Sequence, residues 1–176
     1  MSVRVVVTGS ECTGKTTLAQ RLAAHYGAPW VPEAARAYAE ARQGVLTSAD
    51  VEPIARATTE ALHAAGTPRL LVVDTDLVST VVYARAYYGA CPDWIVAECR
   101  AQLGTLYLLC APDLPWQPDG VRDRPDASDR AAMHAAFEET LREFGARVAL
   151  VRGDGEARTA AAIAATELVV NPETAP

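Results

Sequence analysis

The sequence lacks the features that would assign this protein to a membrane or to nucleic acid. No apolar run approaches the ~18 residues that a membrane-spanning helix needs. Lys and Arg number 16 against 22 Asp and Glu, so the net charge is −6. This balance leaves no basic stripe that could neutralise a phosphate backbone. We therefore expect no membrane and no nucleic acid as a partner.

The few cysteines and histidines exclude further kinds of chemistry. The four cysteines form no C-x-x-C pair and have no histidine at metal-ligand spacing, which argues against a metal-thiolate site. The three histidines lie within helical patterns, and no Ser-His-Asp or Cys-His arrangement is suggested. The first expected strand begins within three residues of the N-terminus. We therefore expect no signal peptide and a cytoplasmic protein.

Residues 9–16, Gly-Ser-Glu-Cys-Thr-Gly-Lys-Thr, match the phosphate-loop pattern G-x-x-x-x-G-K-[ST] at every fixed position. A β-branched run at 3–7 precedes them, and Leu18, Leu22 and Tyr26 mark a helix face after them. In such a strand–loop–helix unit, backbone N–H groups and the positive helix end bind phosphate. The residues expected to bind the donor nucleotide are Gly9, Ser10, Glu11, Cys12, Thr13, Gly14, Lys15, Thr16 and Thr17.

The same loop predicts the cofactors. Lys15 can reach the β- and γ-phosphates, and the Thr16 hydroxyl can ligate Mg²⁺. Asp74 directly follows the apolar run 70–73, and an Asp at the carboxyl edge of a parallel sheet commonly holds Mg²⁺ through a water. We expect ATP as the phosphate donor, with GTP as an alternative, and Mg²⁺ at Thr16 and Asp74.

The chain alternates between buried strands and helical patterns, which predicts a parallel sheet with helices on both faces. The expected strands are 3–7, 30–31, 70–73, 106–109 and 148–151. Helices are expected at 34–43, 94–103 and 156–168, and two more are expected to start at 47 and just after 76. A further amphipathic helix is marked by Met133, Phe137 and Leu141, and either Asp126 or Ser128 is its N-cap. We predict an α/β fold with a phosphate loop after its first strand, and the family resemblance given below implies a P-loop NTPase fold of the nucleoside/nucleotide-kinase type. It would have three α/β/α layers and a five-stranded parallel sheet, forming one domain over 1–170 with a flexible tail at 171–176.

Two carboxylates are candidates for the acceptor side of the reaction. Glu33 follows the second strand and precedes Arg36 by about one helical turn; the pair is either a surface ion pair or a group that orients an attacking hydroxyl. Asp76 either caps the next helix or takes part in catalysis, and an Asp can do both. The sequence leaves both questions open.

Residues 111–127, which we call the lid segment, hold four prolines and charges of both signs. A loop this long is usually functional, so Arg122 and Arg124 are expected to neutralise charge on the transferring phosphoryl group. Ordinary loop solubility is the alternative. Asp154 and Gly155 follow the fifth strand and either contact the nucleotide base or only form a helix-capping turn.

Taken in order, these motifs resemble a known family. The matching stretches are 8–17, the V-P-E-A-A-R at 31–36, the D-T-D at 74–76, the P-W-x-x-D-G-x-R at 115–122 and the R-G-D-G at 152–155. The chain resembles the nicotinamide-riboside kinase domain of the bacterial NadR proteins and its stand-alone relatives. In that family this domain follows a nucleotidyltransferase domain, often with a DNA-binding module ahead of it. Because this chain starts at the first kinase strand, we expect neither activity here.

The resemblance implies phosphorylation of the ribose 5′-hydroxyl of nicotinamide riboside, a small-molecule partner, by ATP and Mg²⁺. The catalytic residues that it implies are Lys15, Glu33, Asp76, Arg122 and Arg124, and the substrate-binding residues are Glu33, Arg36, Tyr38, Asp76, Tyr83, Tyr87 and Trp116. The four aromatic residues are candidates to stack on the cationic pyridinium ring, with ordinary packing as the alternative for each. Rival readings are a kinase for another nucleoside or nucleotide, or a regulatory nucleotide-binding switch. A homo-oligomer remains an open alternative.

Overall fold

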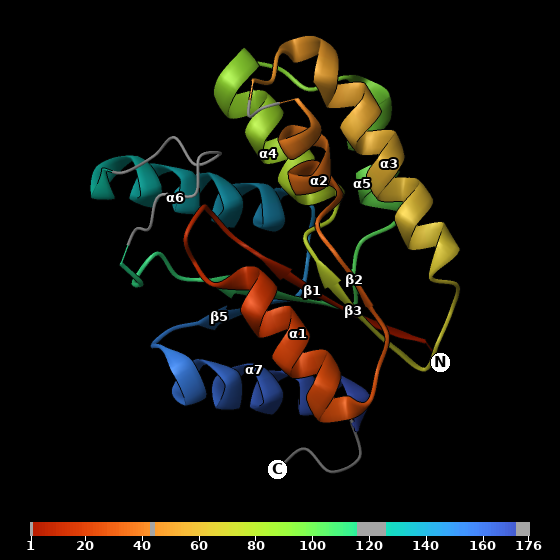
Figure 1. Ribbon diagram of the computed structural model, residues 1–176, viewed down its shortest axis with the longest axis vertical. Helices are drawn as coiled ribbons and strands as arrows, with labels where there is room; N and C mark the ends of the chain where they lie inside the picture. Colours follow the sequence, from red (N-terminus) through yellow and green to blue (C-terminus); the bar gives the residue numbers. More distant parts are fainter. Residues whose placement is uncertain (1, 43–44, 116–125, 172–176) are drawn as a thin grey trace.

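The structure is a computed structural model and describes residues 2–42, 45–115 and 126–171. The described chain contains a five-stranded sheet in the order β2-β3-β1-β4-β5, and all its strand pairs are parallel (Figure 1). The strands are β1 (Val3–Thr8), β2 (Trp30–Val31), β3 (Leu70–Asp74), β4 (Leu106–Cys110) and β5 (Val148–Val151).

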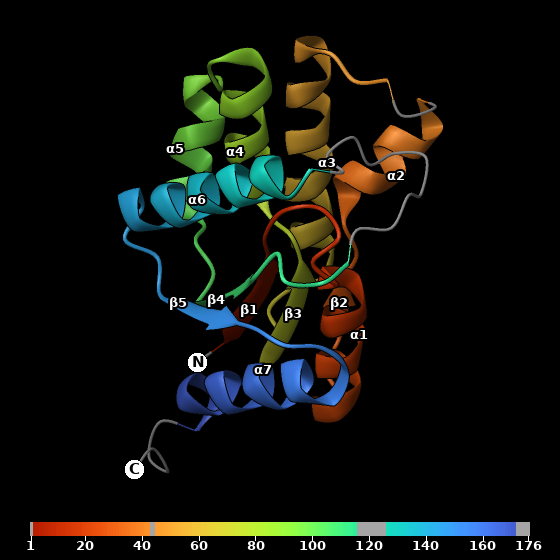
Figure 2. The ribbon, with the colours of Figure 1, turned by 90° about the vertical axis from the view of Figure 1, so that its left-hand side faces the viewer.

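Helices cover both faces of this sheet, so the molecule has three layers (Figure 2). The helices are α1 (Lys15–Tyr26), α2 (Ala34–Ala41), the short 3₁₀ helix η1 (Ser48–Asp50), α3 (Val51–Ala64), α4 (Leu77–Tyr88), α5 (Asp93–Ala101), α6 (Ala127–Glu143) and α7 (Gly155–Val170). Helices α1 and α7 pack on one face, while α3, α4, α5 and α6 pack on the other.

The alternation of side chains along β1 divides the core between these two faces. Val5 and Val7 pack with Leu22 of α1, whereas Val6 packs with Val78 of α4 and Phe137 of α6. Successive side chains of a strand point to opposite faces, so one continuous apolar run serves both layers. This arrangement explains why the central strands carry few polar residues.

The strand register brings the functional segments to one edge of the sheet. Val7 of β1 lies opposite Asp74 of β3 and Leu108 of β4, so these three neighbouring strands end at nearly the same level. The loops that follow them are the phosphate loop, the turn at 74–76 and the start of the lid segment. This edge is where ligands bind in open parallel sheets.

The predicted fold class is confirmed, and the element boundaries differ by a few residues. The helix expected from Thr47 begins as the 3₁₀ turn η1, because the Asp50 carboxylate accepts hydrogen bonds from the Thr47 N–H and hydroxyl. Asp126 occupies the N-cap position of α6, although its side chain makes no capping hydrogen bond. No helix within the described ranges is long and apolar enough to cross a membrane. The domain limits at 1–170 stay a prediction, and residues 172–176 of the expected tail lie outside the described part.

Candidate active site

The phosphate loop has a backbone conformation that requires glycine at its first position. Gly9 has φ 135°, and a Cβ there would lie 2.8 Å from the carbonyl oxygen of Cys110. Gly14 precedes α1 with φ 72°, which is also the left-handed region that glycine favours. Cys12 has φ 55° without being glycine, a strained position that the sequence pattern did not predict.

Side chains of the loop support this curled backbone. The carbonyl oxygen of Ser10 accepts hydrogen bonds from the Thr13 hydroxyl and from Lys15 Nζ, both at 2.8 Å. Lys15 is the single lysine in the chain, and it lies over the loop at the N-terminus of α1. The first turn of α1 carries no acidic residue, so its positive end is not neutralised from within the helix.

Asp74 has the environment expected of a carboxylate that helps to hold a cation. It is completely buried, and neither of its oxygens has a hydrogen-bond partner of standard geometry within the described chain. Burial raises the pKa of Asp74, while the nearby Thr16 hydroxyl, then Lys15 and Arg36, lower it. A buried carboxylate beside a hydroxyl supplies the hard oxygen ligands that Mg²⁺ takes.

The described residues contain no cluster of three or more His, Cys, Asp or Glu side chains that could enclose a metal by itself. A magnesium site of the P-loop type uses one or two protein oxygens together with water and substrate phosphates. Thr16 and Asp74 therefore fit the predicted role, and the assignment of Mg²⁺ to them remains a prediction.

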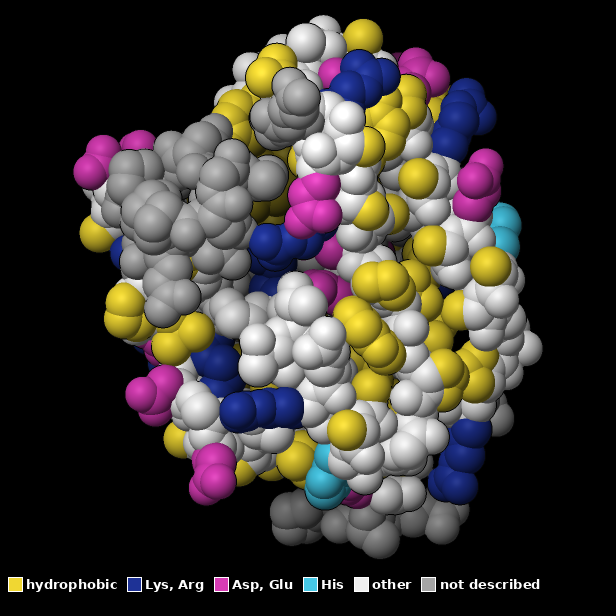
Figure 3. All heavy atoms as spheres, viewed as in Figure 1, with side chains coloured by type: hydrophobic (Ala, Val, Ile, Leu, Met, Phe, Trp, Pro, Cys, Tyr) yellow, Lys and Arg dark blue, Asp and Glu magenta, His cyan; other side chains and the backbone are white. Residues whose placement is uncertain are grey.

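A cavity of about 610 Å³ opens directly beside the phosphate loop. Its walls come from residues 11–17 of the loop and α1, from the start of α2, from α3 and from the inner side of α4. Figure 3 shows acidic and basic side chains gathered around a hollow in this face of the molecule. Of the predicted site residues, Lys15, Thr16, Glu33, Arg36, Asp76, Tyr83 and Tyr87 all line this cavity.

Glu33 stands at the N-cap position of α2, but its side chain does not cap the helix. Burial raises the pKa of the Glu33 carboxyl; Lys15 and Arg36 lower it, while Asp74 and Glu11 raise it further. Glu33 thus lies close to Lys15, in a cavity that Glu11 and Asp76 also line. A carboxylate with a raised pKa in such a cavity suits a proton acceptor.

Asp76 caps α4 and also lines the cavity, so the capping role is observed and the catalytic role stays a prediction. Its Oδ1 accepts a hydrogen bond from the Val78 N–H at 3.0 Å, and its Oδ2 accepts one from the Tyr107 hydroxyl at 2.6 Å. The side chain is buried, and this burial raises the pKa of Asp76 against the lowering effect of both hydrogen bonds. Both oxygens therefore already accept a hydrogen bond from the protein.

The aromatic residues of α4 form one wall of the cavity. The rings of Tyr83 and Tyr87 stack with centroids 5.9 Å apart and planes at 18°. Burial raises the pKa of Tyr83 well above its usual range, and the nearby Glu11 and Glu33 raise it further. Tyr88 also lines the cavity and was not predicted, although it neighbours Tyr87 in the sequence.

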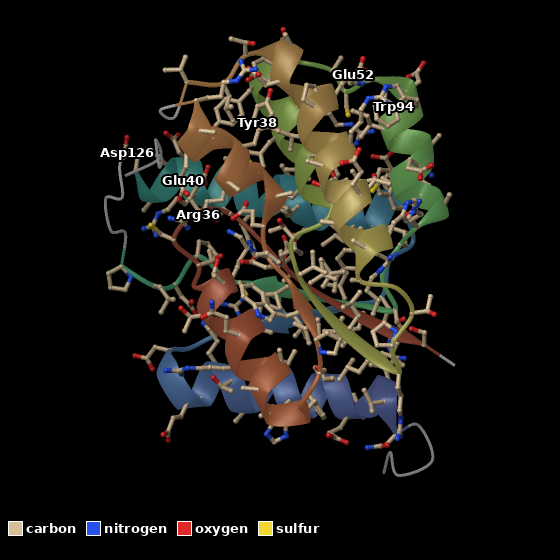
Figure 4. The ribbon with its side chains drawn as sticks, turned by 45° about the vertical axis from the view of Figure 1, so that its right-hand side comes forward. Arg36, Tyr38, Glu40, Glu52, Trp94 and Asp126 are labelled. Carbon is tan, nitrogen blue, oxygen red and sulfur yellow. The ribbon has the colours of Figure 1, made fainter. Side chains whose placement is uncertain are left out.

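Tyr38 is the predicted substrate residue that the structure places elsewhere. It does not line the cavity, because its hydroxyl donates a hydrogen bond to Asp50 Oδ1 at 3.0 Å and accepts one from Arg42 at 2.9 Å. Figure 4 shows Tyr38 on the part of α2 that faces α3, apart from Arg36 and Glu40. The ring joins α2 to the η1–α3 corner, which is the packing alternative named above.

Arg36 forms an ion pair with a residue that the sequence analysis did not name, and it also lines the cavity. Its Nε forms an ion pair with Glu40 at 3.1 Å, an exposed i,i+4 pair of small energetic value. The same guanidinium lines the cavity, and its charge lowers the pKa of both Glu33 and Asp74. The predicted contact of Arg36 with the substrate or a phosphate group stays a prediction.

Other predicted residues belong to the lid segment and to the turn between β5 and α7. Trp116, Arg122 and Arg124 lie outside the described residues. Asp154 is the N-cap residue of α7 and Gly155 has φ 46°; both are exposed, and neither lines the cavity. Their predicted contact with the nucleotide stays a prediction.

Comparisons with known proteins agree with this fold. A family model described as an AAA domain matches residues 4–158. The trifunctional NAD biosynthesis/regulator protein NadR of Salmonella typhimurium is 27% identical over 145 residues, covering 79% of this chain and 35% of that protein. This chain therefore spans about a third of the length of that curated relative.

Solved structures of NadR proteins have the same fold. A NadR protein in complex with NAD and AMP-PNP superposes with a TM-score of 0.72 at 28% identity, covering 94% of this chain and 49% of that chain. A NadR protein in complex with NR superposes with a TM-score of 0.70 at 27% identity, covering 94% and 51%. The match extends over nearly all of this chain and about half of each NadR chain.

Proposed function

This chain belongs to the AAA domain family and is a P-loop kinase domain of the NadR type, and from that premise we propose its reaction. The protein transfers the γ-phosphoryl group of ATP to the ribose 5′-hydroxyl of nicotinamide riboside, giving nicotinamide mononucleotide and ADP. The observation that carries this proposal is the acidic, tyrosine-lined cavity immediately beside the phosphate loop. Its volume of about 610 Å³ suits a small-molecule acceptor.

The charges of the cavity favour a nucleoside over a nucleotide as acceptor. Among the described residues, the basic side chains in the cavity wall are Lys15 and Arg36, and both lie near Asp74. The opposite wall, formed by tyrosines of α4, carries no basic residue in the described chain. A nucleotide acceptor would bring an additional phosphate that needs a cationic partner. A cationic pyridinium ring instead fits tyrosine faces and nearby carboxylates.

The geometry supports different roles for the carboxylates of Glu33 and Asp76. We assign proton acceptance to Glu33, since it does not cap its helix, whereas Asp76 already accepts hydrogen bonds on both oxygens. The 5′-oxygen attacks the γ-phosphorus while its proton passes to Glu33, and the bond to the β–γ bridging oxygen breaks so that ADP leaves. Asp76 would orient the sugar from the other side of the cavity.

The donor side of the reaction uses the phosphate loop. Lys15 and the N-terminus of α1 would stabilise negative charge on the β- and γ-phosphates. Thr16 and Asp74 would hold Mg²⁺, which when bound neutralises charge between these phosphates. Arg122 and Arg124 would add positive charge from the lid segment.

The test is a coupled ADP-release assay with Mg²⁺-ATP and a panel of acceptors: nicotinamide riboside, adenosine, uridine, thymidine and thymidine monophosphate. We expect nicotinamide riboside to give a kcat/KM at least about tenfold above the others, with nicotinamide mononucleotide identified by mass spectrometry. Preferred turnover of another acceptor would refute the substrate while keeping a kinase. ATP binding without stimulation by any acceptor would instead favour the regulatory switch.

A further inference from the structure

Arg158, in the first turn of α7, is a buried cation outside the cavity described above. Its exposed fraction is 3%. Its guanidinium donates hydrogen bonds to the carbonyl oxygens of Gly153 at 2.7 Å, Thr13 at 2.8 Å and Ala111 at 3.2 Å. It also pairs with the carboxylate of Asp113. One side chain thus joins three loops that are far apart in the sequence.

These three loops all lie at the carboxyl edge of the sheet. Thr13 belongs to the phosphate loop, Ala111 and Asp113 begin the lid segment, and Gly153 belongs to the β5–α7 turn. Asp113 strengthens the junction, because its Oδ2 accepts a hydrogen bond from the Gly153 N–H at 2.8 Å. The ion pair and this hydrogen bond together fix the start of the lid segment to the turn before α7.

The contact with Thr13 has a direct consequence for phosphate binding. A trans peptide is planar, so its C=O and N–H groups point in opposite directions. Holding the Thr13 carbonyl toward Arg158 therefore turns the Gly14 N–H away from Arg158. Gly14 lines the cavity side of the loop, where phosphate-binding N–H groups must point.

Only an arginine can make this set of contacts. A guanidinium has five N–H donors in one plane, whereas a lysine ammonium is a single point with three donors. Burying a charge is unfavourable unless it is hydrogen-bonded, so the buried Arg158 depends on these carbonyl and carboxylate partners.

We propose that Arg158 is a positioning residue for the donor nucleotide. It holds the Gly14 N–H toward the phosphates and locks the start of the lid segment and the β5–α7 turn to the phosphate loop. The phosphate loop is then in its binding conformation before the nucleotide arrives, so binding does not carry the entropic cost of ordering the loop. This inference rests on nucleotide binding by the phosphate loop and is independent of the acceptor.

The experiment compares wild type with Arg158→Lys, Asp113→Asn and the double variant, and takes Arg142→Lys as a matched control on the exposed end of α6. Calorimetry measures MgADP affinity, and hydrogen exchange with mass spectrometry maps local opening. We expect Arg158→Lys to weaken MgADP binding about tenfold or more, and Asp113→Asn to weaken it less. Faster exchange should be confined to peptides covering 9–17, 111–115 and 152–158, and Arg142→Lys should match wild type.

A merely structural role would give a different pattern. Unchanged MgADP affinity in Arg158→Lys, or faster exchange spread evenly over all peptides, would overturn the positioning role. If the losses of MgADP binding free energy in Arg158→Lys and Asp113→Asn simply add in the double variant, the coupling through Asp113 is overturned. Failure of the proposed acceptor in the kinase assay would leave these readouts intact, while absence of MgADP binding by wild type would refute both proposals.

Discussion

Replacing Tyr107 with Phe tests how the fold holds the Asp76 carboxylate in the cavity. Tyr107 is completely buried in β4, and its hydroxyl donates to Asp76 Oδ2 at 2.6 Å while accepting from the Gly104 N–H at 3.1 Å. The substitution Tyr107→Phe keeps the ring and removes only the oxygen. A hydrogen bond to a charged group contributes about 1.5–3 kcal/mol, and the abandoned Gly104 N–H adds to the loss.

We therefore expect the free energy of unfolding to fall by about 2–4 kcal/mol. For a domain of this size, each kcal/mol corresponds to about 2–4 °C in Tm. Differential scanning calorimetry and urea unfolding measure the loss. The matched control is Tyr26→Phe, because the Tyr26 hydroxyl also donates to a carboxylate, that of Glu167 at 2.7 Å, but on the rim of α1 and α7. Its loss should be under about 1 kcal/mol, because solvent can replace the partner.

The same variant changes the pH dependence of the reaction in a definite direction. Burial raises the pKa of Asp76 in the folded protein, and the hydrogen bond from Tyr107 lowers it. Because Tyr107→Phe removes this hydrogen bond, it should raise the pKa of Asp76 further. If the Asp76 carboxylate orients the acceptor, the acid limb of kcat/KM moves to higher pH, since protonation then begins at higher pH. If Tyr107→Phe lowered Tm no more than Tyr26→Phe does, and left the acid limb of kcat/KM at the same pH as in Tyr26→Phe, this reasoning would be refuted.

Three further predictions concern the phosphate loop and the cavity. Gly9→Ala should lower the free energy of unfolding by at least about 2 kcal/mol in chemical unfolding and weaken MgADP binding, because the new Cβ would collide with the Cys110 carbonyl. In the control Gly66→Ala nothing lies within 4 Å of the new Cβ, so the free energy of unfolding should fall only by the cost of a left-handed alanine, about 1 kcal/mol. Glu33→Gln should lower kcat by about two or more orders of magnitude with MgADP affinity retained, and Glu60→Gln on the exposed side of α3 should leave kcat unchanged. Because burial raises the pKa of Glu33, the wild-type acid limb should lie above the ordinary value of 4.5, and a limb below it would argue against Glu33 as the base. Tyr87→Ala should raise the acceptor KM about tenfold through loss of the ring, whereas Tyr87→Phe should keep it near wild type; equal effects would assign the role to the hydroxyl instead.

Much of the fold followed from local patterns in the sequence. The five strands and the phosphate loop were placed correctly, because apolar runs, left-handed glycines and helix faces are properties of neighbouring residues. The carboxyl-edge positions of Glu33 and Asp74 also followed, since Asp74 is the last residue of β3 and Glu33 comes shortly after β2. Helix starts were less predictable: the Thr47–Asp50 hydrogen bonds turned an expected helix start into a 3₁₀ turn.

The amino-acid sequence by itself determined which segments reach the sheet edge, because strand order along the chain and parallel pairing fix where each loop emerges. Tertiary structure alone decided which side chains meet there. Tyr38 turns toward Asp50 while Tyr88 reaches the cavity, because each helix is rotated by its packing against neighbours. The pairs Tyr107–Asp76 and Arg158–Thr13 join residues 31 and 145 positions apart. Such contacts depend on the distance between elements in space, which no local pattern of residues encodes.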